Sequence, residues 1–196
     1  MNIIFDTETT GLPPKGGHWE KDFLYFPHIV QLSWKRSDED HVNDYIINNG
    51  VQIPQAATDV HGITQEMAEA SEYSFLDIAI LFIEDAIQAE NIIAHNGYFD
   101  ISIFKANIIR ETLGGSVYLR PKVNEALHKD KRIDTMMRTI KFCAIPFPNG
   151  RGGYKWPKLE ELYFKLFGET FNAHNAKDDV LATERCYLEL IKQGII

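Results

Sequence analysis

The sequence predicts an α/β domain in which helices flank a mixed β-sheet. Three segments have strand composition and come early in the chain, at 2–5, 28–36 and 42–48. These three strands are expected to be antiparallel. A fourth apolar run, at 91–94, follows a helical segment, so it can return parallel to the first strand. Helical patterns dominate the rest of the chain, which is typical of a sheet covered by helices.

Helices are expected where apolar residues recur every three or four positions. The clearest case is 74–88, where Phe75, Ile78 and Phe82 lie on one helical face. Thr64-Gln-Glu-Met67 resembles a capping box, with Thr64 as the expected N-cap. Asn175 is a second expected N-cap, and Gly168 is expected to end the helix before it. The further helices are predicted at 98–110, 134–142, 158–167 and 175–192. Segments 13–27, 112–132 and 145–157 are expected loops, and 58–62 is turn-like.

The chain of 196 residues is long enough for one domain with a substantial core, and no repeat or linker divides residues 1–196. No apolar run could span a bilayer, and the start MNIIFDTE lacks the order of a secretory signal, so we expect a cytoplasmic protein without membrane contact. Cys143 and Cys186 are far apart and form no CxxC pair, which indicates two buried thiols rather than a zinc site or a disulfide.

The formal net charge of −8 argues mildly against nucleic acid as a partner, because phosphate binding favours basic surfaces. Acids that cluster around metal ions would weaken this argument, since bound cations reverse the local sign of charge.

Asp6 and Glu8 are two residues apart at the end of the first strand. Residues i and i+2 of a strand point to the same face, so these carboxylates would repel each other and lose solvation. A hard divalent cation compensates for both effects. The alternative is that the strand has already ended and both acids are solvated.

Three further residues carry weaker signals. Asp100 lies in the first turn of a helix, where the dipole alone favours an acid, but it shares a face with Phe104 and should point inward. Asp179 lies on the buried stripe of the last helix, whereas Asp178 lies on its polar stripe as a solvated acid or a partner for Arg185. His174, just before this helix, is by itself an ordinary surface histidine.

Taken together, these residues resemble the three exonuclease motifs of the DEDDh superfamily, which includes the epsilon proofreading subunit of bacterial DNA polymerase III, ribonuclease T and oligoribonuclease. The matching stretches are FDTETTGL at 5–12, HNGYFD at 95–100 and HNAKDDVLAT at 174–183, and VHGIT at 60–64 is similar to the epsilon-like branch. The resemblance covers nearly the whole chain. It implies a ribonuclease H-like fold with a mixed five-stranded sheet flanked by helices.

The resemblance also implies roles for single residues. Four acids would hold two Mg²⁺ or Mn²⁺ ions, and His174 would be the general base that takes a proton from water. The acids are Asp6, Glu8, Asp100 and Asp179. Further positions would contact the terminal nucleotide: Thr7, Thr9 and Thr10 at its 3′ hydroxyl and base, Leu12 as a wedge below the base, His61, Phe99, and Asn96 near the scissile bond. Core packing is the alternative for Leu12 and Phe99.

Two loops depart from the epsilon pattern and combine aromatic with basic residues, which suits single-stranded nucleic acid. Loop 13–27 carries Trp19 among several basic residues, and loop 145–157 carries Lys155 and Trp156. We expect both loops to flank the substrate channel, with Lys155 and Trp156 as substrate contacts. The alternative is that Trp19 and Trp156 cover the core.

The predicted function is a metal-dependent 3′→5′ exonuclease that releases nucleoside monophosphates from the 3′ end of single-stranded nucleic acid, with DNA in proofreading or repair as the leading substrate. The alternatives are an exoribonuclease of the ribonuclease T or oligoribonuclease type, or a non-catalytic nucleic-acid-binding accessory module. A DNA polymerase is a possible partner, although we expect no extended tail for docking one, because the sequence ends soon after the last predicted helix, and the oligomeric state stays open.

Overall fold

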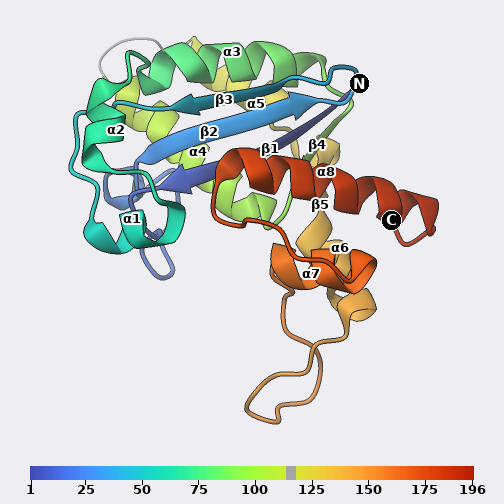
Figure 1. Cartoon of the computed structure of the whole chain (residues 1–196). Helices are drawn as coiled ribbons and strands as arrows, with labels where there is room; N and C mark the ends of the chain where they lie inside the picture. The colour runs from blue at the N-terminus through green and yellow to red at the C-terminus, as the bar shows by residue number, and fades with distance from the viewer. Residues whose placement is uncertain (114–117) are drawn as a thin grey trace.

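The computed structural model describes residues 1–113 and 118–196, and its strands form one sheet in the order β3-β2-β1-β4-β5 (Figure 1). The strands are β1 (Asn2–Thr9), β2 (Ile29–Arg36), β3 (Val42–Ile46), β4 (Asn91–Ala94) and β5 (Arg132–Asp134). β2 is antiparallel to β1 and β3, whereas β4 is parallel to β1 and β5 is parallel to β4. The predicted mixed five-stranded sheet is confirmed.

Helices cover both faces of this sheet, with α3, α4 and α5 on one side and α8 on the other (Figure 1). The helices are η1 (Phe23–Tyr25), α1 (Gln55–His61), α2 (Gln65–Ala70), α3 (Phe75–Gln88), α4 (Gly97–Glu111), α5 (Leu119–Ala126), η2 (Lys129–Lys131), α6 (Thr135–Cys143), α7 (Leu159–Phe167) and α8 (Ala176–Lys192). No helix in the described part of the chain is both long and apolar enough to span a bilayer.

Alternation along β1 decides which layer each of its side chains joins. Ile3 and Phe5 belong to the main core on the side of α3 and α4, whereas Ile4 packs with Val180 of α8. Because side chains of a strand alternate between faces, the face of Ile4 is also the face of Asp6 and Glu8. The acids of β1 therefore point toward α8.

The predicted helix boundaries rest on caps that the structure contains. Thr64 Oγ1 accepts a hydrogen bond from the Met67 N–H at 3.2 Å, and the Asn175 side chain accepts from the N–H groups of Lys177 and Asp178. Gly168 has a φ of 69° after α7, a left-handed conformation that suits glycine. Met67 has no carboxylate to return a bond to Thr64, so α2 has the cap without the reciprocal box.

β1 extends from the apolar segment 2–5 through Asp6 and Glu8 to Thr9, because its antiparallel pairing with β2 continues along the strand. Two other sequence predictions about the elements were wrong. The turn-like stretch 58–62 is mostly helix, since α1 reaches His61 and Gly62 ends it with a φ of 76°.

The expected loop 112–132 instead contains α5, η2 and the start of β5; its residues 114–117 lie outside the described residues. α5 buries just Val123 and Ala126, and β5 has three residues, so neither element carries a long periodic pattern. The two cysteines are free and buried, as predicted, and burial raises the pKa of Cys186 to about 12.

Candidate metal centre and catalytic groove

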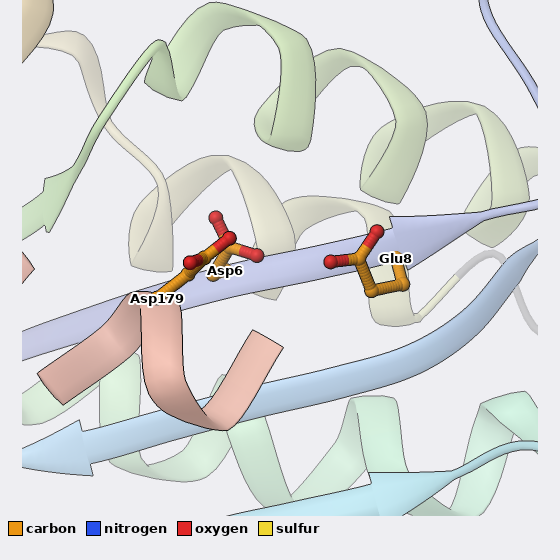
Figure 2. A group of neighbouring side chains, drawn as sticks. All are labelled: Asp6, Glu8 and Asp179. Carbon is orange, nitrogen blue, oxygen red and sulfur yellow. The ribbon is translucent and has the colours of Figure 1, made fainter. Parts of the chain in front are cut away.

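Three carboxylates meet where β1 passes the first turn of α8. Asp6, Glu8 and Asp179 each contribute one carboxylate oxygen, and these three oxygens lie within 4.8 Å of one another (Figure 2). Asp6 and Glu8 share a face because β1 is extended through both, which excludes the alternative that the strand ends before them. Carboxylate oxygens at this spacing are ligands that a hard divalent cation prefers.

Asp100 approaches the same strand from the opposite layer, in the first turn of α4. It is 3% exposed, and its Oδ1 accepts hydrogen bonds from the Thr7 N–H (3.1 Å) and the Thr7 hydroxyl (2.7 Å). Its charge also contributes to raising the pKa values of Asp6 and Glu8. The predicted inward orientation of Asp100 is confirmed, and Thr7 is the residue that orients its carboxylate.

The four acids hold their protons unusually tightly. Burial, followed by repulsion from Asp100 and Asp179, raises the pKa of Asp6 well above its usual value. Burial and the same two neighbours raise the pKa of Glu8 to about 8, and burial raises the pKa values of Asp100 and Asp179 to about 7. Crowded buried carboxylates are destabilised in their charged form unless a cation offsets them, so this donor set fits a divalent metal ion.

These pKa values predict that stability without metal falls as the pH rises. Between about pH 4 and pH 8 the folded protein binds more protons at these acids than the unfolded chain does, so the free energy of unfolding decreases through this window. We expect a loss of at least about 3 kcal/mol in chelator from pH 5 to pH 8, the size that one carboxyl such as Glu8 would give, measured by urea unfolding. Mn²⁺ should restore stability at pH 8 and have less effect at pH 5.

Asp6→Asn is the matched variant for this measurement. It removes one repelling carboxylate and should flatten the fall in stability with pH, because fewer coupled protons are released. Equal slopes for the two proteins would contradict the assignment of the pH dependence to this cluster.

His174 lies at the rim of the site, directly before the Asn175 cap. Its backbone has a φ of 67°, and its N–H points to Asp179 Oδ2 at 3.3 Å. The side chain is exposed, so the imidazole is free of the core. The structure therefore places the predicted base beside one of the predicted ligands.

The choice between Asp178 and Asp179 agrees with the helix geometry. Asp179 joins the carboxylate cluster, whereas Asp178 accepts a hydrogen bond from Asn172 Nδ2 at 3.0 Å outside it. Asp178 does not pair with Arg185, which forms its salt bridge with Glu169 at 2.8 Å.

An open groove of about 520 Å³ surrounds the cluster, and five predicted substrate or orienting residues line it: Thr7, Leu12, Asn96, Phe99 and Trp156. Leu12 is 83% exposed and Trp156 is 63% exposed, so neither side chain serves the core. Phe99 is partly buried and packs against the main core as well.

Four other predicted contacts do not line this groove. Thr9 Oγ1 donates to the Gly11 carbonyl at 2.7 Å, and Thr10 Oγ1 accepts from the His28 N–H at 2.9 Å, so both hydroxyls shape the turn before Leu12. His61 is buried, and its Nδ1 accepts from the Ile63 N–H at 3.0 Å. The fourth is Lys155: its ammonium pairs with both carboxylate oxygens of Glu161, at 2.5 and 2.7 Å.

The two unusual loops behave differently. Loop 145–157 reaches the groove through Trp156, whereas no residue of loop 13–27 lines it. Trp19 packs against the main core instead, which is the alternative that the sequence left open for this side chain.

Among the groove residues that the sequence interpretation did not assign, two have defined interactions with the site. His95 bridges two segments, with Nδ1 3.0 Å from Thr135 Oγ1 and Nε2 3.0 Å from the Pro157 carbonyl, and so holds the base of the Trp156 loop. The place of His95 in the HNGYFD stretch was the sequence signal that could have identified it as a groove residue. Glu160 also lines the groove, and its charge contributes to raising the pKa of Asp179; no sequence signal pointed to it.

A ribonuclease H-like sheet whose central strand carries buried carboxylates against a helix N-terminus defines a class of metal-dependent nucleases. A sequence profile of the exonuclease family (RNase_T) matches residues 3–187. The chain belongs to this exonuclease family.

Individual relatives agree with this family. The chain is 29% identical over 192 residues to a DNA polymerase III subunit epsilon-like protein of Rhodobacter capsulatus, covering 96% of this chain and 23% of that protein. It is 36% identical over 99 residues to the DNA polymerase III subunit epsilon of Pasteurella multocida, covering 50% of this chain and 38% of that one. The chain thus spans about a quarter to two-fifths of the length of these relatives.

Solved structures share the fold. Exonuclease I of Methylocaldum szegediense superposes with a TM-score of 0.71 at 17% identity, covering 98% of this chain and 40% of that chain. Exonuclease I of E. coli gives a TM-score of 0.65 at 20% identity, over 97% of this chain and 40% of that one. The ribonuclease H-like fold expected from the sequence is confirmed.

Proposed function

We propose that this protein is a metal-dependent 3′→5′ exonuclease that releases nucleoside monophosphates from the 3′ end of single-stranded DNA. The observation that carries the proposal is the convergence of Asp6, Glu8 and Asp179 beside Asp100 in an open groove. Such a donor set is suited to two Mg²⁺ or Mn²⁺ ions, since both metals prefer oxygen ligands.

The relatives support DNA as the substrate class. The E. coli exonuclease I that shares this fold was crystallised with a dA16 oligonucleotide, and several relatives are named as epsilon subunits of a DNA polymerase. A single-stranded 3′ end is therefore our first substrate, and a DNA polymerase is a candidate partner. RNA of the kind trimmed by ribonuclease T-like enzymes is the second candidate, because the same family contains that activity.

Each group of residues has a defined task in this reaction. Asp6, Glu8, Asp100 and Asp179 would hold the metal ions, which when bound supply a nucleophile at neutral pH and offset charge on the leaving 3′ oxygen. Thr7 keeps Asp100 in its orientation through two hydrogen bonds. His174 takes the proton of the attacking water, a role that imidazole performs near neutral pH.

The groove supplies orientation. Leu12 and Trp156 present exposed apolar surface to the nucleotide, and aromatic side chains stack on bases without sequence preference. His95 fixes the Pro157 carbonyl and with it the start of α7, so the Trp156 side is anchored to α6.

Incubation with Mg²⁺ or Mn²⁺ and matched DNA and RNA oligonucleotides tests the proposal. One set carries a 5′ label, which reveals stepwise shortening from the 3′ end, and a second carries a 3′ label, which reveals released monophosphates. Faster shortening of DNA supports the proposal, and faster shortening of RNA favours the second candidate. No shortening of either in the presence of metal would overturn both.

Trp156 and its neighbour Lys155 give a differential prediction for substrate binding. Trp156→Ala should weaken binding of a short single strand by about 1–3 kcal/mol if a base stacks on the indole. Lys155→Met should change affinity little, because the ammonium is already paired with Glu161. Fluorescence anisotropy in Ca²⁺, used to allow binding without turnover, measures both; equal losses would contradict the stacking role.

A further inference from the structure

A second cavity, of about 230 Å³, lies between loop 13–27, α4 and α5. It shares no lining residue with the catalytic groove. Its polar lining consists of Lys105 from α4, Arg120 and Asn124 from α5, and Glu20 from the loop, with Trp19 and Phe23 among the apolar residues. Loop 13–27, which does not reach the catalytic groove, thus forms one wall of this separate cavity.

Lys105 is the central charge of this cavity. It is 8% exposed, its ammonium donates to Asn124 Oδ1 at 3.0 Å, and it lies 5.1 Å from the centre of the Trp19 ring. No carboxylate of the described residues lies within salt-bridge distance of it. A buried ammonium held by a neutral amide and a ring, with the exposed Glu20 carboxylate near it but beyond salt-bridge distance, lacks the directly paired counter-charge that such groups usually have.

Two arginines add positive charge around Lys105. Arg120 lines the cavity, and its buried Nε has no hydrogen-bond partner within the described structure. Burial lowers the pKa of Lys105, the charge of Arg132, which lies outside the cavity lining, lowers it further, and the charge of Glu20 raises it. The Arg132 guanidinium donates to the Leu127 carbonyl rather than to an acid.

Acidic side chains near this cavity are few. Glu20 is the single acid among the lining residues, and it is exposed. Residues 114–117 have the sequence Gly-Gly-Ser-Val and carry no carboxylate. Two cations, Lys105 and Arg120, thus line one cavity without a salt bridge to any described residue, and Arg132 lies nearby, in a chain with 28 acidic and 20 basic residues. Their mutual repulsion calls for an anion that offsets it.

We propose that this cavity binds a phosphate group. Phosphate oxygens accept several hydrogen bonds at once, and an ammonium together with a guanidinium supplies donors of the required charge. Trp19 already contacts Lys105 and His18, so the cations rather than the ring are available to a ligand. The phosphate can belong to a nucleic-acid strand or to a free nucleotide; the site goes beyond the proposed exonuclease activity and does not depend on it.

Thermal unfolding of the whole chain in chelator tests this site without metal at the catalytic acids. Inorganic phosphate, a nucleoside 5′-monophosphate and a short single-stranded oligonucleotide are added separately. At a tenfold excess over its Kd, a bound ligand should raise Tm by about 3–6 °C. An effect of all three identifies the phosphate group itself as the ligand, and an effect of the oligonucleotide alone identifies the strand backbone.

Lys105→Met and Arg120→Met should lose this stabilisation. Methionine keeps most of the lysine stem, and Lys105→Met without ligand is expected to keep or raise Tm because an unpaired buried charge is removed. Lys122→Met is the matched control, since Lys122 lies on α5 beside the Tyr118 ring and does not line the cavity. Arg120→Met tests the site independently if Lys105→Met folds poorly. No rise for the unmodified protein, or equal rises for all variants, would overturn the proposal.

Discussion

Asp179→Asn is expected to reduce exonuclease turnover about a thousandfold, because a metal contributes several kcal/mol of transition-state stabilisation and each 1.36 kcal/mol is tenfold in rate. Asp178→Asn should stay within a factor of about two, as surface substitutions usually change free energies by less than about 0.5 kcal/mol. The two residues are adjacent on α8, yet Asp179 alone belongs to the carboxylate cluster. The comparison therefore separates ligation from general charge at the helix start.

Single-turnover degradation of a 5′-labelled strand at saturating Mn²⁺ measures this difference. Asparagine keeps an oxygen that can accept the His174 N–H, so the local backbone of Asp179→Asn should persist. In chelator at pH 8 the same variant should be more stable than the unmodified protein, because a carboxylate crowded by its neighbours is gone. Equal activity losses for Asp178→Asn and Asp179→Asn would refute the assignment.

The orientation of three acids of the metal centre could be predicted from the periodicity of the strand and of the last helix. A period of two puts Asp6 and Glu8 on one face of β1, and a period of 3.6 turns Asp179 rather than Asp178 inward. The two patterns meet because Ile4 and Val180, neighbours of these acids in sequence, pack together in one small core. Periodicity thus oriented these three acids, whereas their common role in metal binding was implied by the resemblance to the DEDDh motifs.

Residues outside regular elements could not be assigned in this way. The ion pair between Lys155 and Glu161 links a loop to the first turn of α7, and nothing in the spacing of the sequence predicts which charge a loop lysine meets. The hydroxyls of Thr9 and Thr10 are directed by the tight turn after β1, which ends the alternation of the strand. Trp19 packs against the main core, where its apolar surface is partly buried. The mixture of aromatic and basic residues in its loop does not predict whether such a side chain faces the core or the substrate.

The same limit applies to α5 and β5. A helix that buries two residues and a strand of three are stabilised by the layers around them rather than by their own pattern. β5 forms because β4 offers it a parallel edge, with Ile93 paired to Ile133. Because α5 contributes Arg120 and Asn124 to the cationic cavity, this cavity could not be predicted from the sequence either.

His174→Gly should lower turnover about a hundredfold to ten-thousandfold while leaving metal binding nearly intact, since general-base catalysis contributes in this range. Glycine is the suitable replacement because the residue has a φ of 67°, which alanine adopts at a cost and glycine adopts freely. The backbone N–H that points to Asp179 is kept in this variant. A loss of rate therefore reports the imidazole rather than a displaced loop.

Added imidazole provides the decisive readout for His174. The side chain is exposed at the groove, so its removal leaves space open to solvent that a free imidazole can reach. Turnover of His174→Gly should rise with imidazole concentration, whereas Asp179→Asn should not respond, because a base cannot replace a missing metal ligand. Mn²⁺ affinity, measured by calorimetry, should be close to that of the unmodified protein for His174→Gly. Unchanged activity of His174→Gly would show that the proton of the attacking water leaves by another route.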